Sequence, residues 1–187
     1  MKKYEFTGET KVENGITLNR IRAIRDFGNV KAGDIGGWIE KEENLSHEGE
    51  AWVFGEAKVY GEAWVFGEAE VFGEAKVFGS AKVGNKAKVG GEAEVFDKAE
   101  VYDKAWVGGE AEVGNKAKVG ANSDYIVFKN WWSSGRYFTW TRSNDMWRVG
   151  CFYGTGEELI KKAYEDSEIS GREYERIVKY VEAIKQK

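Results

Sequence analysis

The feature that most constrains this chain is a six-residue repeat that fills its middle third. Between residues 53 and 119 a valine recurs at every sixth position, and an alanine lies two positions before each of these valines. The residue between them is Trp, Lys or Glu, and Gly, Asn or Asp follows two positions after every Val but the last. A repeat this regular predicts a fold that is itself built from stacked repeating units.

The physics of one repeat indicates its local structure. Ala and Val two positions apart in a strand point to one side, and the residue between them points to the other. The Gly, Asn or Asp that follows tolerates positive φ and permits a turn. Each repeat is therefore predicted to form a short strand and a corner, and three repeats a triangular coil of 18 residues. Stacked coils with paired parallel strands make a mainly β fold, the hexapeptide parallel β-helix, whose usual hand is left, against the right-handed crossover rule.

The register extends backward from the repeat and suggests the domain organisation. Residues 35–52 would form one earlier coil, in which larger side chains occupy the neighbouring inward site, so this coil is irregular or its frame slips. With it the helix has about five coils and stands about 24 Å tall, at ~4.8 Å per coil. We expect an N-terminal cap hairpin over residues 1–34, the β-helix over 35–124 and a C-terminal α+β domain over 125–187.

Both ends of such a stack need caps, because a bare end exposes unpaired strand edges and an open core. Alternating apolar residues around Asn14-Gly15 predict the N-terminal hairpin. The C-terminal domain is predicted to hold three strands, over residues 125–130, 136–142 and 146–153. Two capping boxes, at Thr155–Glu158 and Ser170–Glu173, are predicted to open its two helices.

Residues 18 positions apart stack in columns along this prism. One corner carries a glutamate in every coil although like charges in register cost energy, so it is either a docking edge or a solvated edge. Its residues are Glu56, Glu74, Glu92 and Glu110. Aromatic residues either stack on one another or form a contact face, which we expect to serve a homotrimer or a partner. That face comprises Trp52, Trp64, Trp106, Phe54, Phe72, Tyr60 and Phe78.

The composition excludes several kinds of site. One His and one Cys cannot supply the three or four ligands of a usual zinc site, and no disulfide can form within the chain. We expect no metal and no cofactor. The net charge of −4 gives no general attraction to nucleic acid or anionic membranes. Because no segment reads as a membrane helix or signal peptide, we expect a cytoplasmic protein.

Two stretches resemble proteins encoded by mobile elements. GDIGGWIEKEENLSHEGEAWVFGEAKV (residues 33–59), with the repeats that follow it, resembles hexapeptide-repeat proteins of phage and prophage genomes. RVGCFYGTGEELIKKAYEDS (residues 148–167) is similar to a small C-terminal module often attached to them. The resemblance implies a left-handed β-helix that acts in the cytoplasm of a host cell.

Acyltransferases built on similar repeats indicate what catalysis would require. They use a His base near a subunit boundary and a loop that interrupts a coil, and residues 53–119 contain neither. His47 is the only candidate base, with a structural role as the alternative. Cys151 is expected to be a buried thiol rather than a nucleophile. We therefore predict that the protein is not an enzyme.

A second candidate site lies in the C-terminal domain. Residues 131–148 concentrate tryptophan and arginine, which suit stacking on a base and contacting its phosphate. The alternative is a sheet that packs its apolar side on the helices or on the β-helix end, with Arg at the rim. The candidate residues are Trp131, Trp132, Arg136, Trp140, Arg142, Trp147 and Arg148.

Together these patterns predict a non-enzymatic phage accessory protein, a trimeric scaffold that presents a C-terminal binding module. Its expected role is to inhibit host antiviral defence by binding a host protein or a nucleotide signal. One alternative is a hexapeptide acyltransferase, for which His47→Ala would abolish turnover. The other is a virion structural component, which would be found in purified particles.

Overall fold

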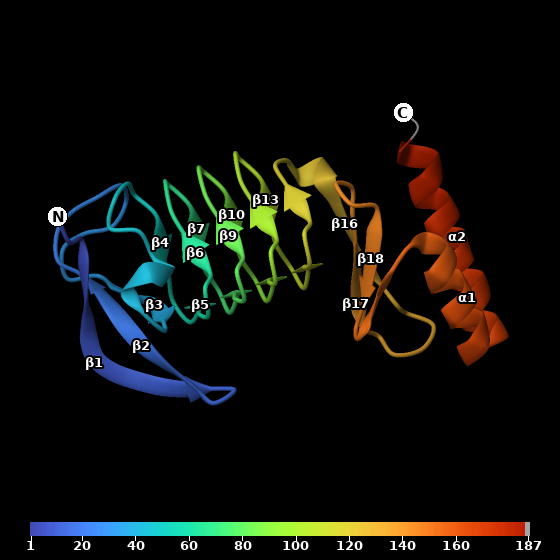
Figure 1. The fold of residues 1–187 in the computed structure, drawn as a ribbon, viewed down its shortest axis with the longest axis horizontal. Coiled ribbons are helices and arrows are strands. Elements are labelled where there is room, and N and C mark those ends of the chain that lie inside the picture. The colour runs from blue at the N-terminus through green and yellow to red at the C-terminus, as the bar shows by residue number, and fades with distance from the viewer. Residues whose placement is uncertain (186–187) are drawn as a thin grey trace.

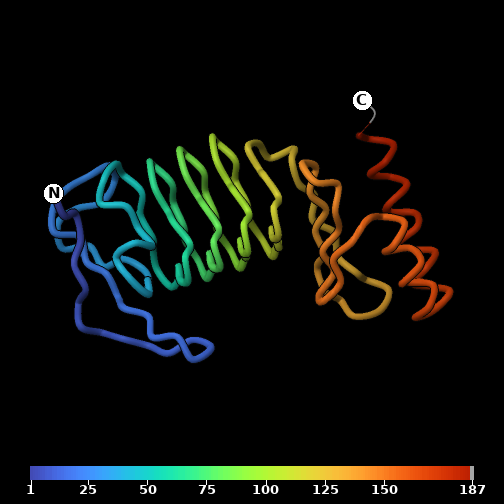
Figure 2. The backbone as a smooth tube through the Cα atoms, viewed as in Figure 1, coloured from blue at the N-terminus to red at the C-terminus, as the bar shows by residue number. Residues whose placement is uncertain are grey.

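The protein is a β-solenoid of about five turns that ends in an antiparallel sheet and two helices. A computed structural model describes residues 1–185. In Figure 1 the coils stack along the long axis, with the N-terminal hairpin at one end and the two helices at the other. The backbone trace in Figure 2 shows the corners of successive coils lying in line. The predicted mainly β solenoid is confirmed, while the hand of its coil stays a prediction.

Each coil places one short strand in each of three parallel sheets, as the repeat predicts. The first sheet contains β4 (Trp52–Val53), β7 (Glu70–Val71), β10 (Lys88–Val89) and β13 (Trp106–Val107). The second contains β6 (Trp64–Val65), β9 (Lys82–Val83), β12 (Glu100–Val101) and β15 (Lys118–Val119). The third contains β5 (Lys58–Val59), β8 (Lys76–Val77), β11 (Glu94–Val95) and β14 (Glu112–Val113). All repeat Ala and Val side chains are buried in one continuous core.

The N-terminal cap extends the third sheet. Strands β1 (Tyr4–Glu13) and β2 (Ile16–Ala23) form the predicted hairpin, which turns at Asn14-Gly15 with both φ angles positive. Strand β2 pairs with β3 (Ile35–Ile39), and β3 pairs in parallel with β5. The hairpin therefore continues the solenoid's own hydrogen bonding and closes one end.

The first coil slips in frame, which is one of the two predicted alternatives. Ile39 pairs with Val59 and Leu45 with Val65, in each case 20 residues ahead rather than 18. Regular spacing returns at Trp52, which pairs with Glu70. The chain takes up the two extra residues after a short helical turn, η1 (Glu42–Asn44), and the large side chains Ile39 and Leu45 then occupy Val positions of the core.

The C-terminal sheet has four strands, and the prediction of three is wrong. After η2 (Asn122–Asp124) come β16 (Tyr125–Lys129), β17 (Tyr137–Thr141), β18 (Met146–Val149) and β19 (Phe152–Gly154). The predicted strand over 146–153 breaks because Gly150 adopts a positive φ of 57° and turns the chain. Cys151 lies exposed in this turn, so the expectation of a buried thiol is also wrong.

Two helices follow the sheet. Helix α1 (Gly156–Asp166) begins with the predicted capping box, in which the Thr155 and Glu158 side chains bond each other's backbone N–H. Helix α2 (Glu168–Lys185) begins before the predicted cap at Ser170, which is buried inside its first turn. The Ser167 hydroxyl instead accepts from the Ser170 N–H at 3.1 Å. Among residues 1–185, neither helix is long and apolar enough to cross a membrane.

The hydrogen bonds between coils determine what each end requires. In every strand the N–H of the outward residue donates to the alanine carbonyl of the next coil, as Lys88 does to Ala105 at 2.9 Å. The last coil has no successor, yet its outward N–H groups on all three sheets are bonded. They donate to side-chain oxygens of the C-terminal segment: Trp106 to Asn122 (2.8 Å), Glu112 to Thr139 (3.0 Å) and Lys118 to Ser143 (2.7 Å).

At the opposite end, the Ala51 carbonyl has no preceding coil to donate to it. The buried Lys3 side chain donates to it instead. Lys3 is fully buried, and its Nζ lies 2.7 Å from the Ala51 oxygen and 4.9 Å from the centre of the Phe27 ring. Burial, with a smaller contribution from the Arg25 charge, lowers the pKa of Lys3 to about 8. The N-terminal cap therefore closes the first coil at the cost of holding an ammonium group out of water.

We predict that this buried lysine makes stability rise with pH between about 8 and 9.5. In that range the folded protein loses the Lys3 proton, whereas the unfolded chain, with an ordinary lysine pKa, keeps it. Unfolding then takes up a proton, so the free energy of unfolding increases with pH. Relative to Lys3→Met, wild type should gain roughly 1–2 kcal/mol in urea unfolding across this range. Lys31→Met is the exposed control, and a pH-independent difference between wild type and Lys3→Met would contradict the account.

Candidate functional site

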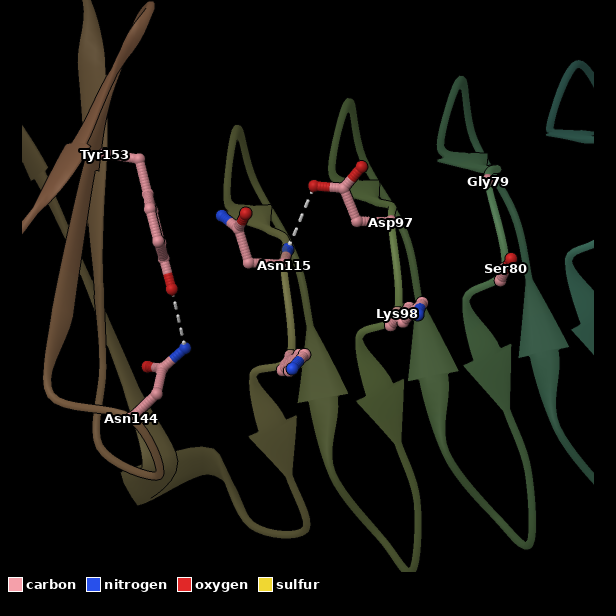
Figure 3. Close-up of a pocket in the computed structure, with 8 residues that line it drawn as sticks. Gly79, Ser80, Asp97, Lys98, Asn115, Asn144 and Tyr153 are labelled. Atoms are coloured by element: carbon pink, nitrogen blue, oxygen red, sulfur yellow. Dashed lines mark hydrogen bonds between the residues drawn. The ribbon is translucent and has the colours of Figure 1, made fainter.

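A groove of about 710 Å³ runs along one corner of the solenoid and ends against the C-terminal sheet. Successive coils supply its floor, and two residues of the C-terminal sheet region supply its end wall (Figure 3). The lining residues are Gly79, Ser80, Asp97, Lys98, Asn115, Lys116, Asn144 and Tyr153. The groove thus joins the two parts of the fold that the sequence pattern treats separately.

The floor is fixed by left-handed corners. Asp97 and Asn115 have φ angles of 56° and 59°, a region that these two residue types enter more readily than most. The Asn115 N–H donates to the Asp97 carboxylate at 3.2 Å and ties one coil to the next (Figure 3). The Asn115 Nδ2 is buried and has no hydrogen-bond partner within residues 1–185. A buried amide donor without an acceptor carries a free-energy cost that a ligand oxygen would remove.

Lys98 and Lys116 stand one above the other on consecutive coils. Both are exposed, and neither forms an ion pair with any carboxylate of the described chain. In the neighbouring columns Lys86, Lys88 and Lys118 each pair with a glutamate one coil away, whereas Lys82 and Lys104 form no ion pair within residues 1–185. Two ammonium groups held at the ~4.8 Å coil spacing would repel by about 1 kcal/mol in water. The groove therefore holds two lysine charges against the single carboxylate of Asp97 among its lining residues.

The end wall presents a hydroxyl group in a fixed position. Asn144 Nδ2 donates to the Tyr153 hydroxyl at 3.2 Å, and Asn144 Oδ1 accepts from Thr141, so the amide is held from both sides. Because the Tyr153 oxygen accepts this bond, its own proton is free to donate. Burial, together with the Asp97 charge, raises the pKa of Tyr153 and keeps that proton in place at neutral pH. Lysines, amide and phenol together make a site suited to an oxygen-rich anion.

His47, the predicted candidate base, has no nitrogen open to a substrate. Its Nδ1 accepts from the Lys3 N–H at 3.3 Å, and its Nε2 is buried, 3.6 Å from the Glu42 carboxylate. The ring stacks on Tyr4 at 4.2 Å, and burial lowers the pKa of His47. The geometry therefore indicates that this histidine helps to hold the N-terminal cap.

The predicted tryptophan–arginine set does not converge on one surface. Trp140 and Trp147 are buried against the two helices, whereas Trp131 is 74% exposed and Trp132 half-buried. The arginines point elsewhere. Arg142 donates to the Ser123 carbonyl, Arg148 pairs with Glu112 at 3.1 Å, and Arg136 lines a hollow beside Glu92 and Glu110. As a ligand site these residues remain a prediction, and their positions match the packed sheet that was the alternative.

The acidic edge is neutralised at one end. Glu56 accepts hydrogen bonds from Arg20 and Lys11 of the N-terminal hairpin and from Trp38 of β3, and the Arg20 contact is the main reason its pKa falls to about 2. The remaining members, Glu74, Glu92 and Glu110, are exposed. The hairpin therefore uses the top of this edge as an anchor.

The predicted aromatic contact face is mostly internal packing. Trp52 is buried under the cap against Phe27, and Tyr60 stacks on Phe78 at 5.2 Å. Other rings lie over a glycine of the next coil: a Cβ on Gly90 would come within 2.2 Å of the Phe72 ring. Phe54 packs against the core. Trp64 and Trp106 remain exposed, on different sheets.

Sequence reasoning missed the groove although the sequence contains one signal for it. One corner column reads Glu62, Ser80, Lys98 and Lys116. Neither lysine therefore has a glutamate next to it in that column. The contribution of Tyr153 and Asn144 depends on how the C-terminal sheet docks on the last coil, which the repeat does not specify.

Comparison with known proteins corrects one prediction. No protein-family model matches the chain. Over 62 residues the chain is 39% identical to a protein of Escherichia coli (strain K12) described as "Uncharacterized acetyltransferase YdcK". The match covers 29% of this chain and 19% of that protein, so the chain spans about a fifth of the length of the relative it matches. This similarity points to an enzyme, and the prediction of a non-enzymatic protein is corrected on that ground.

Proposed function

We propose that the protein is a β-solenoid acetyltransferase whose substrate site is the corner groove of Lys98, Lys116 and Tyr153. The observation that carries this proposal is the groove's set of donors that have no partner within residues 1–185: two lysines, a phenol proton and a buried amide. The similarity to a protein named as an acetyltransferase supports the same class of reaction.

The groove contains groups that suit acyl transfer from a thioester. An acceptor amine or hydroxyl would attack the thioester carbonyl, the C–S bond would break, and the sulfur would leave as a thiol after taking up a proton. The Tyr153 O–H and Asn115 Nδ2 are donors able to stabilise the oxyanion that forms on the carbonyl oxygen. Asp97 is the carboxylate in this groove and can accept the proton of the attacking group. This route makes no use of His47.

We predict that purified protein releases coenzyme A from acetyl-CoA in the presence of a panel of amine and hydroxyl acceptors. Exposed Cys151 would react with the thiol reagent, so the assay needs a Cys151→Ser background. Tyr153→Phe should lower kcat about 10-fold or more by removing the oxyanion donor. Tyr180→Phe, which removes the hydroxyl of an exposed tyrosine of α2 outside the groove, is the matched control.

His47→Gln separates this route from the histidine-dependent alternative. Activity retained in His47→Gln and lost in Tyr153→Phe supports the groove. Activity lost in a folded His47→Gln and kept in Tyr153→Phe contradicts it, as does the absence of any acceptor-dependent release.

The protein is further proposed to be a homotrimer. Trp64 and Trp106 are 42% and 53% exposed on two different sheets, so a cyclic assembly in which each copy contacts two neighbours would cover both. Light scattering should give about three times the chain mass of 21.1 kDa, and a monomer mass over the micromolar range would contradict this.

A phage accessory role is the second proposal, since the same donors suit the phosphates of a nucleotide signal used in host defence. It draws on the resemblance of residues 33–59 to phage-encoded repeat proteins. The protein would then protect an infecting phage by sequestering such a nucleotide or by binding a host defence protein. Deleting the gene should lower phage yield on a defended host only, and equal loss on an undefended host would contradict it.

A further inference from the structure

The two lysines in the groove have a specific spacing. Lys98 and Lys116 occupy equivalent corner positions on consecutive coils, so the solenoid sets their backbones about 4.8 Å apart. Elsewhere along the solenoid, several stacked charges of opposite sign pair across this same step, as Lys88 does with Glu70 at 2.8 Å. The lysine pair has the same one-coil spacing as these ion pairs, but in the described part of the chain neither lysine has a negative partner.

We propose that the groove binds the diphosphate group of a ligand, with Lys98 and Lys116 each contacting one of its two phosphates. Lysine is a compact point charge that commonly binds phosphate. Two lysines on adjacent coils therefore match a diphosphate better than a single phosphate. Ser80, one coil before Lys98 in the same corner column, lines the groove and offers a hydroxyl to the remaining phosphate oxygens. The inference rests on the proposed function in using the same groove, but phosphate binding requires no acyl transfer.

The balance of charges favours an anion over a cation or an apolar ligand. Asp97 is the one carboxylate that lines the groove, and it already accepts from the Asn115 N–H. The ammonium groups of Lys98 and Lys116 outnumber this one carboxylate. The groove, at about 710 Å³, is large enough to leave room for a group attached to the diphosphate.

The test is calorimetric titration of the full chain with inorganic pyrophosphate, orthophosphate, AMP and ADP at low ionic strength. We expect pyrophosphate to bind about 10-fold or more tightly than orthophosphate, and ADP likewise over AMP. Lys98→Gln and Lys116→Gln should each weaken pyrophosphate binding about 10-fold, and added salt should weaken it further. Lys82→Gln should have no effect. ADP bound more tightly than pyrophosphate indicates a nucleotide ligand, and equal binding indicates recognition of the diphosphate alone.

The proposal is overturned if pyrophosphate binds no more tightly than orthophosphate, or if Lys82→Gln weakens binding as much as Lys98→Gln. The outcome is separable from the proposed function. Diphosphate binding without acetyl-CoA turnover leaves this inference standing and removes the acetyltransferase. Turnover in a protein whose pyrophosphate affinity is unchanged by Lys98→Gln and Lys116→Gln removes this inference and leaves the acetyltransferase.

Discussion

The hydrogen bond from the outward residue of one coil to the alanine carbonyl of the next is the interaction on which the rest of the molecule depends. Each coil is too thin to bury a core alone, so its Ala and Val are covered only when these bonds hold the next coil in place. The same bonds make both ends costly, because the last N–H groups and the first carbonyl have no coil to meet. The flanking segments supply what each end lacks: side-chain oxygens from Asn122, Thr139 and Ser143 at one end, and the Lys3 ammonium at the other.

This way of closing the ends also builds the candidate site. The C-terminal sheet lies against the last coil because its Thr139 and Arg148 bond to Glu112. That docking sets Tyr153 and Asn144 beside the corner of Asn115 and Lys116. Neither the solenoid nor the sheet contains the groove by itself. A site on rigid, regularly spaced corners keeps its donors at fixed separations, which is the condition for recognising linked phosphates or for stabilising an oxyanion.

The sequence predicts the solenoid well because its period is a local property that repeats many times. Burial of Ala and Val, corners at Gly, Asn and Asp, the Asn14-Gly15 hairpin and the Thr155 capping box all follow from residue type and spacing. The errors occur where a neighbouring residue supplies a competing local signal or where a tertiary contact overrides the local pattern. Ser167 replaces Ser170 as the start of the second helix, Gly150 divides one strand into two, and the cap covers Trp52.

The candidate site was less predictable for the same reason. Tryptophan and arginine crowd together along residues 131–148, but strand alternation sends Trp140 toward the helices and Arg148 toward the solenoid. The groove gathers residues from positions 79 to 153, and the one pattern that links them is the coil-to-coil column of Lys98 and Lys116.

Amide hydrogen exchange on the intact protein tests most directly the claim that the C-terminal segment completes the ladder. If side-chain oxygens close the last coil, the amides of Trp106, Glu112 and Lys118 should be protected to nearly the same extent as those of Lys88, Glu94 and Glu100 in the coil before. Thr139→Val should release Glu112 selectively, because only its acceptor is removed. Exchange of all three terminal amides at the rate of an open loop would contradict the account, since the groove would then have no fixed wall.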